Sequence, residues 1–303
     1  MSLIDHRKIK LSSIFRLPPP NKTRLGFIRL DKNERYNKHK NIFIKELKKE
    51  ISSDLISAYP EFQKIYKILS NKFKININNI VLTPGSESAL KNTFEIFYKK
   101  NQKVITINPT FAMVDIYCKV FKTKQVKIGY NEKLELDINH LKKSIDKKTC
   151  LIIIANPNSP TGSLIKEKDL EAIIIKAKKY GIKILVDEAY YEFSKYNFLN
   201  KIKKYDNLII IRTFSKIFGL AGLRAGYVAS NHKNIKKYIS IKPMYEINSV
   251  AVKAIELLLQ KPNIIASYLK EMRDGESYAK NFCKKNNYKF IKCFANFYHI
   301  NFN

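Results

Sequence analysis

One lysine of this chain stands in a context that could support chemistry. Lys216 follows residues 207–211, a short run of apolar and β-branched residues typical of a buried strand. The hydroxyl groups of Thr213 and Ser215 precede it, and Arg224 follows eight residues later. Hydroxyl groups together with an arginine are suited to bind a phosphate. An amine beside a phosphate site indicates a lysine that forms a Schiff base with pyridoxal phosphate.

Lysine is abundant here, because 49 of the 57 basic residues are lysine, so Lys216 alone could be an ordinary surface residue. Three further predicted strands favour the chemical interpretation, since each ends in polar residues suited to the same ligand. They are residues 79–82, 150–155 and 183–186, followed in turn by Gly85, Ser86 and Glu87, by Asn158 and Ser159, and by Asp187 and Tyr190. Sheets of α/β proteins bind ligands outside the carboxyl ends of their strands, so we expect these groups to meet at one site.

Taken together, these segments resemble the fold-type I, class I and II pyridoxal-phosphate-dependent aminotransferases, and among them the histidinol-phosphate aminotransferase-like group. The similarity runs from residues 30–34 to the end of the chain, through the motifs TPGS (83–86), NPNSPTG (156–162), DEAY (187–190) and TFSK (213–216). It implies an α/β fold with a mainly parallel sheet sandwiched by helices and a smaller α+β domain. It also implies transfer of an amino group from an amino acid or amino-phosphate donor to a 2-oxo acid, with pyridoxal 5'-phosphate as cofactor.

The resemblance gives three residues a catalytic role. Lys216 would hold the cofactor as a Schiff base, and its freed amine would move the proton of the substrate α-carbon. Asp187 would keep the pyridine nitrogen protonated, and Tyr190 would donate to the phenolic oxygen of the ring. In isolation, Asp187 fits a cap at a strand–helix junction equally well, and Tyr190 fits simple packing.

The remaining candidates would bind the cofactor. Phe111 would stack on its ring. Its phosphate would lie at a helix start, where backbone N–H groups bind anions, and against three side chains from the Lys216 stretch. These residues are Gly85, Ser86 and Glu87, together with Thr213, Ser215 and Arg224. Tyr59 matches a tyrosine that relatives offer to the phosphate of the neighbouring subunit, which implies a homodimer with a shared active site.

The NPNSPTG loop departs from the family pattern. The residue before Pro-Thr-Gly is usually asparagine, which contacts the ring oxygen and the substrate carboxylate, whereas here it is Ser159 with Asn158 beside it. Serine is shorter, so the contact could be lost, bridged by water or transferred to Asn158. Both residues therefore stay candidates.

Composition excludes several other classes of site. The net charge of +31 is spread along the chain and carried mostly by lysine, which favours a solvated surface over a nucleic-acid-binding face. The four cysteines show no CxxC spacing and the histidines are dispersed, so no metal site is expected. No stretch has the length of a membrane span and no leader is evident, which predicts a cytoplasmic protein.

The order of predicted elements divides the chain into three parts. Residues 1–52 would form an arm, with Pro18, Pro19 and Pro20 excluding a helix, a short strand at 27–31, and part of a small domain. Residues 53–242 alternate strands and helices and would form the large cofactor domain. Residues 243–303, with a long helix over about 250–281 and two late strands, would complete the small domain.

The substrate carboxylate lacks an evident partner. The family supplies an arginine beyond the strand that matches residues 296–301, whereas Arg273 is the only arginine here after Arg224 and lies in a predicted surface helix. This predicts a C-terminally truncated small domain and weak transamination, unless Arg24, Arg29 or Arg35 substitutes.

Two alternatives remain open at this stage. A pyridoxal-phosphate-dependent decarboxylase or carbon–sulfur lyase could use the same fold, because no motif decides which bond to the α-carbon breaks. A non-catalytic, basic nucleic-acid-binding protein could also use this scaffold.

Overall fold

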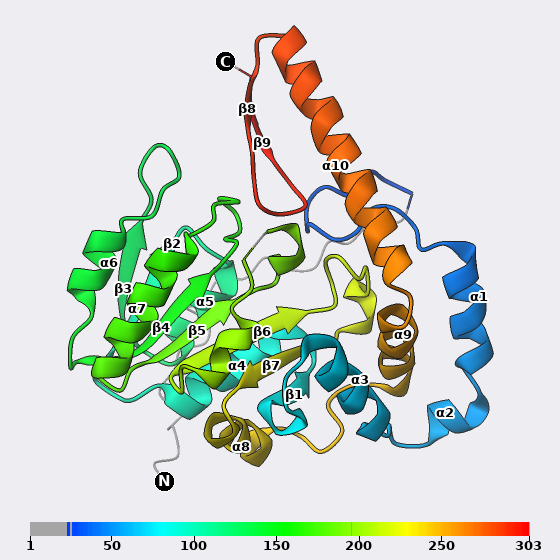
Figure 1. Ribbon diagram of the computed structural model, residues 1–303, viewed down its shortest axis with the longest axis horizontal. Coiled ribbons are helices and arrows are strands. Elements are labelled where there is room, and N and C mark those ends of the chain that lie inside the picture. The colour runs from blue at the N-terminus through cyan, green and yellow to red at the C-terminus, as the bar shows by residue number, and fades with distance from the viewer. Residues whose placement is uncertain (1–22, 25, 195, 303) are drawn as a thin grey trace.

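A seven-stranded sheet forms the centre of the molecule (Figure 1). The computed structural model describes residues 23–302 except 25 and 195. The strands lie in the order β1-β7-β6-β5-β4-β2-β3; β7 is antiparallel to both its neighbours, β1 and β6, and the other neighbouring pairs are parallel. Their bounds are β1 Ile80–Thr83, β2 Lys103–Asn108, β3 Lys124–Gly129, β4 Thr149–Ala155, β5 Lys183–Asp187, β6 Leu208–Thr213 and β7 Gly226–Ser230. The predicted mainly parallel α/β sheet is confirmed.

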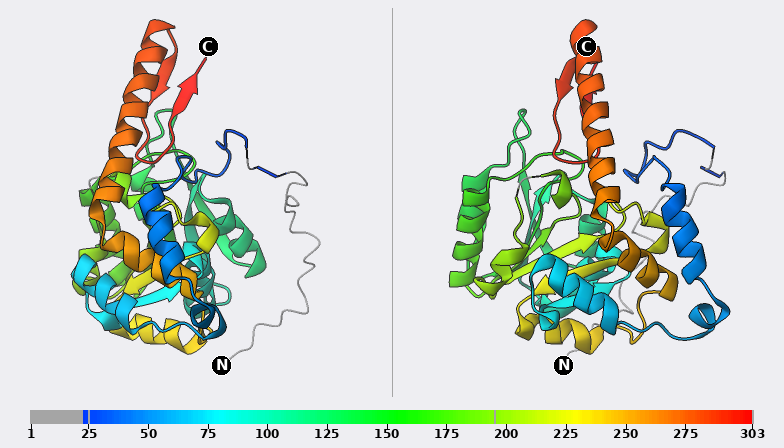
Figure 2. Two further views of the ribbon diagram at one scale, coloured as in Figure 1. Left: turned by 90° about the vertical axis from the view of Figure 1, so that its right-hand side faces the viewer. Right: turned by 45° about the vertical axis from the view of Figure 1, so that its right-hand side comes forward.

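Helices cover both faces of this sheet (Figure 2). Ile152 and Ile154 of β4 belong to one hydrophobic core, and Leu151 and Ile153 belong to the other. Strands buried on both faces are apolar at every position, which explains the continuous run at 150–155. The first core is completed by α3 (Gln63–Phe73), α6 (Ile138–Ser144), α7 (Glu167–Lys179) and α9 (Ser249–Leu259), and the second by α4 (Gly85–Phe97), α5 (Ala112–Val120) and α8 (His232–Ile241).

The C-terminal part projects from this body as α10 (Pro262–Lys285) with the hairpin of β8 (Lys289–Ile291) and β9 (His299–Asn301) (Figure 1). The N-terminal helices α1 (Asn41–Glu50) and α2 (Ser53–Ser57) pack against α9. Short 3-10 turns cover Ile77–Asn79, Tyr191–Phe193, Leu199–Lys203 and Ala221–Leu223. The predicted domain boundaries stay a prediction, although α9, which lies beyond residue 242, shares a core with the sheet.

The structure differs from the predicted elements near both ends of the chain. The predicted strand at 27–31 is wrong: the stretch is irregular between bends at 27 and 31 and pairs with no described strand. Its charged residues Arg29 and Asp31 instead form ion pairs with Glu34 and Arg24, which lie just outside the stretch. The predicted helix over 250–281 is two helices, because Pro262 has no N–H to continue α9 and begins α10 instead. The proline run at 18–20 lies outside the described residues.

Gly226 brings the start of α4 against the end of β6. It pairs with Thr83 of β1 and with Thr213 of β6, so three segments converge on its Cα. A Cβ atom at this position would lie 2.6 Å from the Ser86 amide nitrogen and 2.7 Å from the Arg212 carbonyl oxygen. Only glycine allows this close approach, which places the α4 N-terminus beside the residues that follow β6.

We expect Gly226→Ala to lower the free energy of unfolding by about 1–3 kcal/mol, the usual cost of forcing atoms into a packed site. Urea unfolding measures it. The matched control is Gly275→Ala, inside α10, where nothing lies within 4 Å of an added Cβ. That change should be neutral or stabilising by up to about 1 kcal/mol. Equal stability of Gly226→Ala and the wild-type protein would contradict the close approach.

Candidate active site

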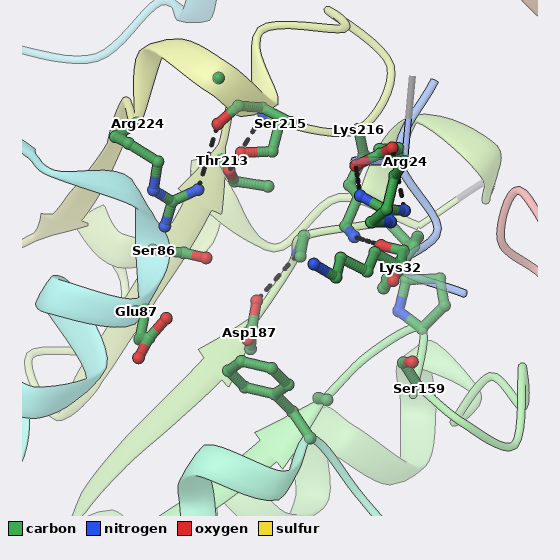
Figure 3. A pocket seen from close by; sticks show the side chains of 18 residues that line it. Arg24, Lys32, Ser86, Glu87, Ser159, Asp187, Thr213, Ser215, Lys216 and Arg224 are labelled. Carbon is green, nitrogen blue, oxygen red and sulfur yellow. Dashed lines mark hydrogen bonds and ion pairs between the residues drawn. The ribbon is translucent and has the colours of Figure 1, made fainter. Parts of the chain in front are cut away.

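The carboxyl ends of β1, β4, β5 and β6 meet at a cavity of about 410 Å³ (Figure 3). Ten of the predicted residues line it: Ser86, Glu87, Phe111, Ser159, Asp187, Tyr190, Thr213, Ser215, Lys216 and Arg224. The N-terminal segment adds Arg24, Lys32 and Glu34 to the lining. Side chains that are far apart in the sequence therefore share one space, as the strand-end argument predicted.

One corner of the cavity has the form of an anion cradle. Gly85 has φ +76° at the first position of α4, and the Arg224 guanidinium nitrogen would lie 3.0 Å from a Cβ placed there. Thr213 Oγ1 donates to Ser215 Oγ at 2.9 Å and accepts from the Ser215 amide at 3.1 Å. Figure 3 shows Arg224 and Ser86 on the same side of the cavity as Thr213 and Ser215. A helix N-terminus, an arginine and two hydroxyl groups fit the phosphate of pyridoxal phosphate.

Asp187 lies at the end of β5, on the floor of the cavity (Figure 3). Its carboxylate accepts a hydrogen bond from the Ala189 amide at 2.9 Å. Burial raises the pKa of Asp187 from 3.8 to about 6, although the Ala189 hydrogen bond and the positive charge of Lys216 act in the opposite direction. A partly buried carboxylate of this kind can stabilise a cationic group placed above it.

Lys216 reaches the cavity from the turn that follows β6. Its Nζ donates to the Lys32 carbonyl oxygen at 3.1 Å and lies 5.3 Å from the centre of the Tyr190 ring. The Tyr190 hydroxyl is held at 3.4 Å by the Asn33 side-chain amide. Phe111, 40% exposed, presents its ring to the same space from the residues before α5.

Asn158 does not line the cavity. Its side-chain NH₂ donates to the Pro109 carbonyl and to Thr161 Oγ1, and its side-chain oxygen accepts from Thr110 Oγ1. The residue is almost completely buried and holds the loop in shape, while Ser159 faces the cavity. Gly85 forms the cradle from behind without lining the space. Tyr59 lies elsewhere on the surface, 73% exposed and stacked on Tyr245.

Of the arginines considered for the substrate carboxylate, only Arg24 lines this cavity, and it is paired with Asp31 and Glu34. Arg29 pairs with Glu34. Arg35 is buried, with its guanidinium 4.2 Å from the centre of the Tyr268 ring. Arg273 lies on α10 beside a different cavity.

Two contributions were not anticipated from the sequence. Lys32 extends its amino group into the cavity from the N-terminal segment (Figure 3). Beneath the floor, Arg212 and Glu188 form an ion pair at 2.6 Å with both side chains about 1% exposed. The sequence carried a signal for this ion pair, because Glu188 and Arg212 are charged residues at the ends of two strongly apolar strands, β5 and β6.

Other kinds of site find no support in the described ranges. No group of three or more histidine, cysteine, aspartate or glutamate side chains among them could hold a metal ion. No helix among them has the length and apolar character needed to cross a membrane.

Comparisons with known proteins identify the family of the chain. A family profile described as aminotransferase class I and II matches residues 17–286. A histidinol-phosphate aminotransferase of Clostridium novyi (strain NT) is 32% identical over 265 residues, covering 85% of this chain and 71% of that protein. The solved histidinol-phosphate aminotransferase of Clostridium acetobutylicum has a TM-score of 0.74 and 26% identity, covering 84% of this chain and 76% of its own.

A structure of histidinol-phosphate aminotransferase from Sinorhizobium meliloti in complex with pyridoxal-5'-phosphate shares the fold, with a TM-score of 0.80 at 18% identity over 89% of this chain and 74% of that one. The family profile spans most of the sequence, and the cavity lies where the resemblance placed it. The chain therefore belongs to the class I and II aminotransferases, and pyridoxal phosphate is its cofactor.

Proposed function

We propose that this cavity transfers an amino group from histidinol phosphate, or a closely similar amino-phosphate or amino acid, to a 2-oxo acid. One observation carries the proposal: the Lys216 amine, the Asp187 carboxylate and the anion cradle at Gly85 line or border a single cavity. The histidinol-phosphate aminotransferases among the relatives support the choice of donor. Four free, buried cysteines in the described residues suit a reducing compartment, so we place the reaction in the cytoplasm.

The residues of the cavity would serve four tasks. The phosphate of the cofactor would be bound by the α4 N-terminus and by Thr213, Ser215 and Arg224. Phe111 would hold the ring by stacking, Asp187 would act on its nitrogen by charge, and the Tyr190 hydroxyl would donate to its oxygen. Lys216 Nζ would attach the cofactor covalently, and Ser159 would border the substrate.

Pyridoxal phosphate bound there supplies an electron sink for the bonds of the donor α-carbon. Lys216 Nζ would accept the α-proton of the donor as general base and return it as general acid. Asp187 would hold a proton on the ring nitrogen by its negative charge. The Lys32 carbonyl, 3.1 Å from Lys216 Nζ, orients that amine before the cofactor binds.

A decarboxylase or carbon–sulfur lyase would need the same cofactor-binding residues. The products separate these reactions from transamination. Incubation with histidinol phosphate and 2-oxoglutarate should yield equal amounts of glutamate and the oxo product without release of carbon dioxide or thiol.

We also propose a homodimer in which Tyr59 reaches the partner's cofactor phosphate. Tyr59 is 73% exposed and lies outside the cavity of its own subunit, and its ring is held by stacking on Tyr245 at 4.1 Å. An exposed tyrosine, with an apolar ring and a hydroxyl group that can form a hydrogen bond, suits contact with a second chain.

Lys216→Ala should fold but retain no covalently bound cofactor. Borohydride reduction of the loaded wild-type protein, followed by peptide mass spectrometry, should find the cofactor mass on Lys216. Lys32→Met is the sharpest control, because Lys32 also presents an amine to the cavity. In this variant the label should stay on Lys216. A label on Lys32 would contradict the assignment.

Asp187→Asn should stabilise the cofactor-free protein in a pH-dependent way. The folded-state pKa of about 6 lies above the ordinary 3.8, so wild-type stability falls as pH rises between about 4 and 6. The variant cannot ionise, so its advantage should grow over that range and level off at roughly 2–3 kcal/mol. In the loaded enzyme the same change should reduce turnover by about two orders of magnitude.

Denaturant unfolding from pH 4.5 to 8 measures the first effect. Asp206→Asn is the control with the opposite sign, since a hydrogen bond from Lys178 lowers the pKa of Asp206. That variant should lose stability relative to wild type above pH 4. A pH-independent difference for Asp187→Asn would show that Asp187 is only a structural cap.

Tyr59→Phe should weaken cofactor retention during dialysis, because the partner's phosphate loses a hydrogen bond. Tyr278→Phe is the matched control, as Tyr278 is 74% exposed on α10. Sedimentation should find a dimer for all three proteins. A monomer that retains pyridoxal phosphate as tightly as a dimeric relative does would refute the shared site.

A further inference from the structure

The cationic side chains that line the cavity differ in whether another protein group or a proposed role already occupies them. Among the described residues they are Arg24, Lys32, Lys216 and Arg224. Arg224 lies against Gly85 in the anion cradle, and Lys216 is the proposed attachment point. Arg24 is neutralised by two carboxylates of its own segment, Asp31 and Glu34.

Lys32 is the exception. Its amino group forms no ion pair and no hydrogen bond with any other described side chain, and Figure 3 shows it extended into the cavity. An ammonium group that has no ion-pair partner can bind an anionic ligand in the cavity without first breaking a contact with the protein.

The backbone around Lys32 is held in place from several directions. The Lys32 carbonyl accepts from Lys216 Nζ, and the Asn33 carbonyl accepts from Asn296 Nδ2 at 2.9 Å. Glu34 is held by Arg24 and Arg29 at 3.2 and 3.3 Å. These contacts fix the backbone of Lys32 beside the Lys216 amine, whereas its side chain is exposed and has no hydrogen-bond or ion-pair partner among the described side chains.

We propose that Lys32 binds the anionic group of the amino donor and of the 2-oxo acid, a carboxylate or a phosphate, and thereby positions the substrate over Lys216. The assignment rests on the proposed function. A lysine ammonium is a compact point charge on a flexible stem, so it accepts either group, whereas an arginine fork prefers one planar, bidentate arrangement. This property suits a site whose two substrates carry different anions.

Binding of unreactive anions to the cofactor-loaded protein tests the proposal without turnover. Isothermal titration calorimetry with succinate, which has neither an amino nor a 2-oxo group, and separately with inorganic phosphate, compares wild type with Lys32→Met. We expect the variant to bind about tenfold more weakly or worse, the scale of a lost hydrogen bond between charged groups. Lys32→Arg should recover most of the affinity for succinate.

Lys38→Met is the matched control, because Lys38 is an exposed lysine of the same segment that lines no part of this cavity. It should bind both anions as wild type does. A loss confined to phosphate, or to succinate, would support the proposal and identify the group that Lys32 binds.

Two results would overturn the assignment of Lys32, and a third would also refute the proposed function. Unchanged affinities in Lys32→Met with normal cofactor absorption would show that Lys32 is not the anion partner, as would a loaded wild-type protein that binds neither anion. A wild-type protein that takes up no pyridoxal phosphate would refute the proposed function itself, and the role of Lys32 with it.

Discussion

The buried ion pair between Arg212 and Glu188 is the interaction on which the site depends. Arg212 Nε and Nη2 both donate to Glu188 Oε2, at 2.8 and 2.6 Å, and Glu188 Oε1 accepts from the Phe198 amide. Glu188 follows Asp187 directly, and Arg212 directly precedes Thr213, so the pair ties the ends of β5 and β6 together under the cavity. Separating them would leave a buried charge uncompensated, at a cost of about 3–5 kcal/mol.

Above this floor, the Asp187 carboxylate lies between cationic side chains on two sides of the cavity. Arg224 and the start of α4 lie at one end, brought there by the glycine at 226, and Lys32 reaches in from the N-terminal segment. Asp187 occupies the floor between them, where burial raises its pKa and a cationic ring would lower it again. A cofactor with a phosphate at one end and a protonated ring matches this order of charges.

Two distant parts of the chain hold the surroundings of the cavity in place. The N-terminal segment touches Lys216 and Tyr190, and the C-terminal hairpin region touches the loop that carries Ser159. There the Phe294 amide donates to the Gly162 carbonyl at 2.8 Å, and His299 Nε2 lies 2.9 Å from the Pro160 carbonyl oxygen. The geometry of the site therefore depends on how these segments dock as well as on the sheet.

The sequence by itself determined the sheet and most of the site, because both follow from local patterns. Buried parallel strands read as continuous apolar runs, and residues just past their ends must face one edge, so Asp187 and Lys216 could be placed together. Tertiary structure decided the rest. Residues 27–31 have strand-like composition but meet no partner strand, and the orientation that aims Lys32 inward comes from contacts with residues more than 150 positions away. Asn158 is likewise turned away from the cavity because its side chain forms hydrogen bonds within the folded structure, which leaves Ser159 to line the cavity. Such contacts produce no periodic pattern in the sequence and could not be predicted from it.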